Sequence, residues 1–205
     1  MNICVFGDSI TWGACDYFHG GWVNRLRNYF EERGDTPLGA DGRLADLSVY
    51  NLGICGDTTD DLKERFEVEA MAREPGSIIF AIGINDARRL EGNNQQTGLA
   101  QFEKNILELV NSARKFTKKI VFVGLTRVDE AKTTPIPWNT RMSYYNQDID
   151  QYDEIIREVC KKEELEYIDA FGIVQRDDLE DGLHPNSEGH KKMFEKIKED
   201  ICKLI

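Results

Sequence analysis

Short, continuous runs of apolar residues alternate along the chain with longer segments in which apolar residues recur every three or four positions. The short runs are typical of strands that are buried on both faces, because such strands have no solvent-facing positions to interrupt the run. The predicted strands are residues 3–6, 49–52, 78–82, 120–123 and 167–168.

The longer segments have the spacing of amphipathic helices, with one apolar stripe each. One stripe begins at Trp22, another at Phe102, a third at Tyr152, and a last one runs from Met193 to Leu204, with Asn186 or Ser187 as its predicted N-cap. Strands that alternate with helices predict an α/β fold, in which a parallel sheet carries helices on both faces.

The 205 residues contain no internal repeat, no low-complexity tract and no Pro/Ser-rich linker. A chain of this length is long enough to bury a substantial core within one domain. We therefore expect a single domain over residues 1–205.

The net charge of −11 and the sequence pI near 4.8 disfavour nucleic acids and anionic membranes as partners, because long-range repulsion opposes both. No run of about 18 apolar residues predicts a membrane span. The first residues have no positively charged segment before an apolar core, so no export signal is predicted and a cytoplasmic location is expected. Homo-oligomer formation is left open.

The five cysteines do not have the spacing of a metal site or a disulfide framework. Reduced thiols and no bound metal are therefore expected.

Polar residues and glycines cluster where the predicted strands end. Because ligands of parallel α/β sheets bind at the carboxyl ends of the strands, these clusters are the candidates for chemistry. The clusters are Gly7-Asp8-Ser9; Asn51, Gly53, Gly56 and Asp57; Gly83, Asn85 and Asp86; and Asp181 with His184.

Ser9 is the candidate nucleophile, with Asp8 expected to brace its turn through backbone hydrogen bonds. A serine hydroxyl needs an adjacent base, and histidine is the usual one. Of the three histidines, His184 is favoured because Asp181 stands three residues before it and can orient its ring. His190 is expected on the surface among lysines, and His19 has no neighbour that would orient it.

An attacking serine would create an oxyanion, which needs preorganised hydrogen-bond donors. The predicted donors are the backbone amides of Ser9 and Gly56 and the side-chain amide of Asn85.

These motifs resemble those of the SGNH (GDSL-type) hydrolase family. The matching residues are Ser9 in FGDSI, Gly56 in NLGICGD, Asn85 in GIND, and Asp181 and His184 in DGLHP, in the family's order. The resemblance implies a three-layer α/β/α sandwich with a flavodoxin-like sheet of about five parallel strands. It also implies hydrolysis of carboxylic esters or thioesters without a metal or organic cofactor. In the Gly-Asp-Ser motif of this chain the next residue is Ile10, where the family more often has leucine.

The sequence narrows the class of substrate less than it narrows the reaction. Trp12, Trp138 and Tyr144 are candidates for stacking on a sugar or lining an acyl site, with ordinary packing as the alternative. A small soluble ester with a short acyl chain is expected, such as an acetylated sugar or a thioester. The alternatives are a lysophospholipase, an acyl-CoA thioesterase, a flavodoxin-type cofactor binder, and a non-catalytic binding module on the same scaffold.

Overall fold

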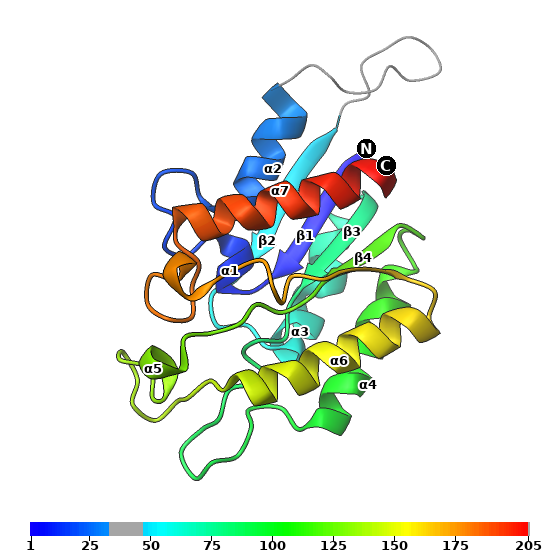
Figure 1. Cartoon of the computed structure of the whole chain (residues 1–205). Coiled ribbons are helices and arrows are strands. Elements are labelled where there is room, and N and C mark those ends of the chain that lie inside the picture. The colour runs from blue at the N-terminus through cyan, green and yellow to red at the C-terminus, as the bar shows by residue number, and fades with distance from the viewer. Residues whose placement is uncertain (33–46, 205) are drawn as a thin grey trace, which may run out of the picture.

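The computed structural model describes residues 1–32 and 47–204 of the chain (Figure 1). The elements in this part of the chain are β1 (Asn2–Gly7), α1 (Ser9–Trp12), α2 (Gly21–Glu32), β2 (Ser48–Gly53), α3 (Thr59–Met71), β3 (Pro75–Ala81), α4 (Leu99–Ala113), β4 (Ile120–Val123), α5 (Glu130–Thr133), α6 (Asn146–Lys162), β5 (Glu166–Ile168), the 3₁₀ turn η1 (Arg176–Asp178) and α7 (Ser187–Leu204).

The five strands form one parallel sheet in the order β2-β1-β3-β4-β5. Each predicted strand coincides with one of them, although β3 begins three residues earlier than predicted, at Pro75, and ends at Ala81. The predicted α/β class with a flavodoxin-like parallel sheet is therefore confirmed.

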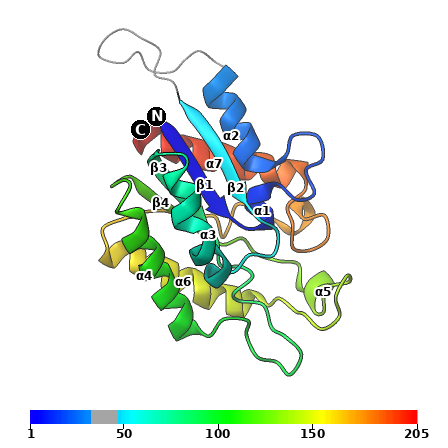
Figure 2. The same cartoon turned by 180° about the vertical axis from the view of Figure 1, so that it is seen from behind.

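Helices cover both faces of this sheet. On one face α2 packs against α7, and on the other α3 packs against α4 and α4 against α6, as the two opposite views show (Figures 1 and 2). The sheet is thus the middle layer of three, which explains why the central strands β1, β3 and β4 are almost entirely buried, whereas the edge strands β2 and β5 are partly exposed. None of the described helices combines the length and the apolar composition that crossing a bilayer requires.

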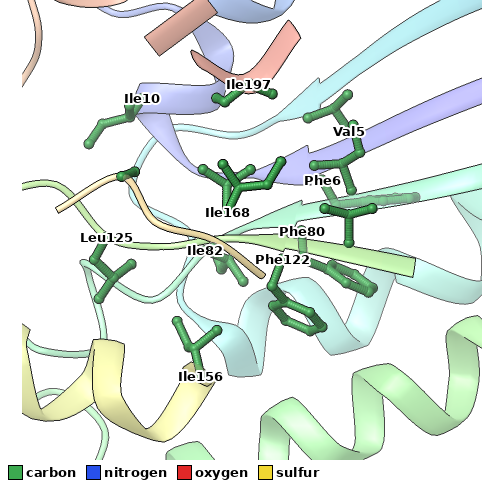
Figure 3. Close-up of a cluster of buried hydrophobic side chains, with 14 of the residues drawn as sticks. Val5, Phe6, Ile10, Phe80, Ile82, Phe122, Leu125, Ile156, Ile168 and Ile197 are labelled. Atoms are coloured by element: carbon green, nitrogen blue, oxygen red, sulfur yellow. The ribbon is translucent and has the colours of Figure 1, made fainter. Parts of the chain in front are cut away.

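A row of phenylalanines crosses the sheet on one of its faces. Phe6, Phe80 and Phe122 are register partners on β1, β3 and β4, and their rings lie 6.0 Å and 5.0 Å apart. Phe66 of α3 packs on this row, 4.8 Å from Phe6. Figure 3 shows Phe80 and Phe122 on one side of the strands and Ile197 of α7 on the other. Each buried phenylalanine contributes about 1.5–3 kcal/mol of transfer free energy, so this row anchors the strands whose ends carry the polar clusters.

The parallel strands place the predicted polar clusters at one edge of the sheet. The strand order reverses between β1 and β3, since β2 lies on the outer side of β1, and such a switch point opens a crevice at the carboxyl ends. The Gly7–Ser9 turn follows β1, and the loops with Gly56 and Asn85 follow β2 and β3.

Candidate active site

A tight strand-to-helix turn places Ser9 at the end of β1. The turn requires glycine at position 7, because a Cβ there would lie 2.1 Å from Thr11 Oγ1 and 2.3 Å from the Ala81 carbonyl oxygen. Asp8 is the N-cap of α1, and its Oδ1 accepts a hydrogen bond of 2.9 Å from the Ile10 amide. The expected bracing by Asp8 is confirmed.

Ser9, His184 and Asp181 form a hydrogen-bonded chain. Ser9 Oγ lies 2.9 Å from His184 Nε2, and His184 Nδ1 lies 2.7 Å from Asp181 Oδ2. The Asp181 carboxylate also organises its own turn, since its Oδ1 accepts bonds from the amides of Leu183 and His184. With a carboxylate on Nδ1, that nitrogen carries the proton and Nε2 faces the hydroxyl as an acceptor.

Hydrogen bonds also keep Asp181 ionised. Burial alone would raise the pKa of this carboxyl group, but the bonds from the His184 ring and from the backbone amides of His184 and Leu183 outweigh burial and lower the pKa. The group is therefore a carboxylate at neutral pH, as the orientation of the imidazole requires.

The other two predicted residues lie on neighbouring loops that are tied together. Asn85 is buried, and its Nδ2 donates to the Asp57 carbonyl at 3.0 Å, directly after Gly56. Gly56 has a φ of +88°, a conformation that side-chain-bearing residues rarely adopt, and the position of its missing Cβ is open space. The Asn85 Nδ2 retains a second N–H for another acceptor.

Tyr144 positions Asn85 and does not line a stacking surface. It is 2% exposed, and its hydroxyl donates to Asn85 Oδ1 at 2.8 Å. Burial raises the pKa of Tyr144 to about 12, so the hydroxyl remains a donor at neutral pH. This bond fixes the amide with its nitrogen directed toward Asp57. A sequence shows that a tyrosine is present but not that its hydroxyl reaches across 59 positions.

Arg65 of α3 was missed by the sequence analysis. Its Nε pairs with Asp57 at 2.7 Å, and its Nη2 donates to the Gly7 carbonyl at 3.2 Å. This side chain therefore connects the exit of β1 with the loop that follows β2. The helical position of Arg65, eight residues after Asp57, is the only signal in the sequence that could have indicated the pair.

The two candidate tryptophans are exposed. Trp138 is 52% exposed, and its ring centroid lies 5.8 Å from that of His184 with an interplanar angle of 29°. Trp12 is 57% exposed at the end of the short helix that begins with Ser9. Trp138 thus presents free surface next to His184, and Trp12 is exposed three residues after Ser9.

The prediction for His190 was wrong. This residue is fully buried, and its Nε2 lies 2.9 Å from the Ala14 carbonyl oxygen. Burial lowers the pKa of the imidazole, which favours the neutral form. His190 lies on the inner face of α7 with Met193 and Ile197, so the helical stripe begins at His190 and not at Met193. His19, by contrast, is exposed.

Asp8 is a carboxyl group without an ion-pair partner among the described residues. Burial raises its pKa to about 7, against the opposing effects of the Ile10 amide and of His184. Because the pKa of Asp8 is higher in the folded protein than in the unfolded chain, the free energy of unfolding depends on pH.

We expect an Asp8→Asn variant to lose part of the pH dependence of folding stability. The Asp8 carboxyl in the unfolded chain ionises near 3.8 and in the folded protein near 7, so its contribution is fully present below about pH 4 and is lost as pH rises through about 7. Asparagine can still cap the helix. As pH rises from about 4 to about 7, the free energy of unfolding of the variant should therefore increase by a few kcal/mol relative to that of wild type, at about 1.36 kcal/mol per pKa unit.

Urea unfolding of both proteins at about pH 4.5 and about pH 8 measures the difference. Asp86→Asn is a comparison variant, since burial also raises the pKa of Asp86, to about 6. If wild type and Asp8→Asn lose stability in parallel, Asp8 does not titrate as described.

Comparisons with known proteins show what this chain is similar to. The model of the GDSL-like Lipase/Acylhydrolase family matches residues 5–192. An uncharacterized lipoprotein, YqeF, from Bacillus subtilis is 29% identical over 56% of this chain, but the match spans only 44% of that protein. An acetylxylan esterase from Geobacillus stearothermophilus is 24% identical, over 70% of this chain and 67% of the esterase.

Solved structures share the fold at low identity. A lipase/acylhydrolase from Enterococcus faecalis has a TM-score of 0.78 and 23% identity, and the alignment covers 100% of this chain and 97% of that one. A catalytic mutant of Axe2, an acetylxylan esterase from Geobacillus stearothermophilus, has a TM-score of 0.73 and 20% identity, with 98% and 93% covered.

Proposed function

The chain belongs to the GDSL-like lipase/acylhydrolase family and is a carboxylic ester hydrolase, and we propose that it removes short acyl groups, acetyl above all, from carbohydrate esters. The observation that carries the proposal is the chain of two hydrogen bonds, 2.9 Å and 2.7 Å long, from Ser9 through His184 to Asp181. For Axe2, catalytic mutants at a serine, an aspartate and a histidine have been crystallised.

In the proposed reaction, Ser9 Oγ attacks the acyl carbonyl while His184 Nε2 takes the hydroxyl proton. The carboxylate of Asp181 stabilises the imidazolium that forms. His184 then protonates the leaving alcohol, and an acyl group remains on Ser9. Water repeats the sequence, with its proton going to Nε2, and releases the acid and the free serine.

The oxyanion of each tetrahedral intermediate would be bound by the amides of Ser9 and Gly56 and by the Asn85 side chain. Gly56 is exposed to solvent, and the bond from Asn85 Nδ2 to the carbonyl of the next residue, Asp57, ties the loops of the two donors together. Donors fixed in this way need no reorganisation during the reaction.

A Tyr144→Phe variant is expected to lower kcat about 2- to 10-fold with little change in KM. The change removes one hydrogen bond, with a net value of about 0.5–1.5 kcal/mol, and leaves Asn85 Oδ1 unpaired, so the amide becomes free to turn. Asn85→Ala, which deletes the donor itself, should cost about 10²–10³-fold.

Steady-state kinetics on p-nitrophenyl acetate measures both effects. Tyr145→Phe is the matched control, because it removes a neighbouring hydroxyl and leaves the Tyr144–Asn85 bond in place. Equal kcat values for Tyr144→Phe and Tyr145→Phe would refute the positioning of Asn85 by Tyr144.

A bulky, soluble alcohol is the leaving group that fits the rim of the site. Exposed indoles at Trp12 and Trp138 can stack on sugar rings, which present apolar C–H faces. The charge of −11 disfavours anionic headgroups and coenzyme A as leaving groups. An acetylxylan esterase among the relatives supports an acetylated saccharide.

The test compares p-nitrophenyl acetate, butyrate and octanoate, acetylated xylo-oligosaccharides and acetyl-coenzyme A. We expect kcat/KM to fall as the acyl chain lengthens, and acetate to be released from the oligosaccharide faster than from the thioester. Faster cleavage of the octanoate than of the acetate would indicate a lipase. Cleavage of the thioester alone would indicate a thioesterase. A folded protein that cleaves none of these esters would contradict the assigned triad.

A further inference from the structure

A thiol that the proposed reaction does not use lies beside the triad. Cys15 follows α1, and its Sγ lies 4.0 Å from Asp181 Oδ2, the oxygen that also bonds the His184 ring. The thiol sulfur, the carboxylate oxygen and the ring nitrogen all lie within 4.8 Å of one another. The 166 positions between Cys15 and Asp181 explain why the spacing of the cysteines predicted no metal site.

This donor set suits zinc. Zn²⁺ takes sulfur at about 2.3 Å and nitrogen or oxygen at about 2.0–2.2 Å, and sites that keep a fourth position for water have three protein ligands. Tetrahedral ligands at these lengths are about 3.3–3.6 Å apart. The distance of 4.0 Å between Sγ and Oδ2 is slightly longer than the spacing of tetrahedral ligands. The distance of 2.7 Å between Oδ2 and Nδ1 is shorter, so these two atoms must move apart slightly when the metal binds.

The surrounding charge also favours a cation. The Asp181 carboxylate lies against the Cys15 thiol, and a second acidic residue, Glu180, directly precedes Asp181 in the chain. Asp181 forms no ion pair with lysine or arginine among the described residues. A divalent ion would offset these charges, and a thiolate selects zinc over hard cations such as Mg²⁺.

We propose that Cys15, Asp181 and His184 form an inhibitory zinc site within the active centre. Zn²⁺ binds Sγ, Oδ2 and Nδ1 with a water molecule in the fourth position, and the thiol proton is released to solvent. Nδ1 can bind the metal only without its proton, so the ring proton moves to Nε2. When Nε2 carries a proton, His184 cannot accept the proton of the Ser9 hydroxyl. Hydrolysis then stops although all three triad side chains are intact.

The test is a zinc titration of p-nitrophenyl acetate hydrolysis in metal-free buffer, with EDTA added at the end. Wild type should be inhibited reversibly, and Cys15→Ser and Cys15→Ala should need at least about 10-fold more zinc for half-inhibition. Each variant is compared with its own activity in EDTA. Cys55→Ser and Cys202→Ser are the matched controls, because both cysteines are exposed. They should be inhibited like wild type.

Cobalt provides a readout that does not depend on turnover. Co²⁺ added to wild type should give a near-ultraviolet sulfur-to-cobalt charge-transfer band that zinc displaces and that is missing in Cys15→Ala. Insensitivity of wild type to zinc, equal inhibition of wild type and Cys15→Ala, or a cobalt band that persists in Cys15→Ala would each overturn the proposal. The cobalt band can be measured even if the proposed substrates are not cleaved, so failure of the zinc site and failure of the proposed function are distinguishable.

Discussion

Replacing Ser9 with alanine is expected to lower kcat on p-nitrophenyl acetate by about 10⁴-fold or more, the range found when the nucleophile of a serine hydrolase is removed. The change deletes the hydroxyl that lies 2.9 Å from His184 Nε2. It leaves the cap of α1 intact, since the Asp8 side chain and the Ile10 amide form that cap. The folded structure should therefore survive while acyl transfer is lost.

Labelling with a fluorophosphonate probe complements the kinetics, because the probe reacts only with an activated serine. Wild type should be labelled and Ser9→Ala should not. Ser112→Ala is the matched control, since this serine lies on α4 and bonds the exposed Glu67. It should behave as wild type. Labelling of the Ser9→Ala variant would assign the nucleophile to another residue.

The fold could be predicted because its signals are local. A strand buried on both faces is mostly apolar, and the five runs predicted on this basis are the strands of one sheet, although the edge strands β2 and β5 are partly exposed. The place of the candidate residues follows from a related rule: parallel strands bring their carboxyl ends to one edge, so the loops with Ser9 and Asn85, which follow β1 and β3, lie at the same edge of the sheet.

Contacts across long sequence separations could not be predicted in this way. The bond from Tyr144 to Asn85, the stacking of Trp138 on His184 and the approach of Cys15 to Asp181 depend on how loops fold over the sheet edge. Loop conformation follows turn chemistry and packing, which a pattern of apolar residues does not encode.

His190 is a different kind of error, because its signal was available. The residue lies three positions before Met193 and seven before Ile197, which is the spacing of the buried face of α7. The prediction of a surface position rested on the polarity of His190 and its lysine neighbours, although the helical spacing indicated a buried position. The hydrogen bond to the Ala14 carbonyl satisfies one ring nitrogen and makes burial of the neutral ring tolerable.

An Asp181→Asn variant is expected to fold normally and to lose about 10⁴-fold in kcat, the cost of the equivalent change in serine proteases. The asparagine Oδ1 can still accept from the amides of Leu183 and His184, so the turn is retained. Its Nδ2, however, is a donor in the place of Oδ2. A donor opposite Nδ1 forces the His184 proton onto Nε2, where it blocks proton transfer from Ser9.

Glu180→Gln separates this effect from a simple loss of charge. The substitution also removes one negative charge, from an exposed side chain next to Asp181, but leaves the 2.7 Å bond between Oδ2 and Nδ1 in place. Its kcat should remain within a few-fold of wild type. Unchanged unfolding of Asp181→Asn in urea, with kcat lost, would show that the tautomer of His184 controls the reaction. Near wild-type kcat in this variant would mean that Asp181 only shapes the turn, and that another group orients the imidazole.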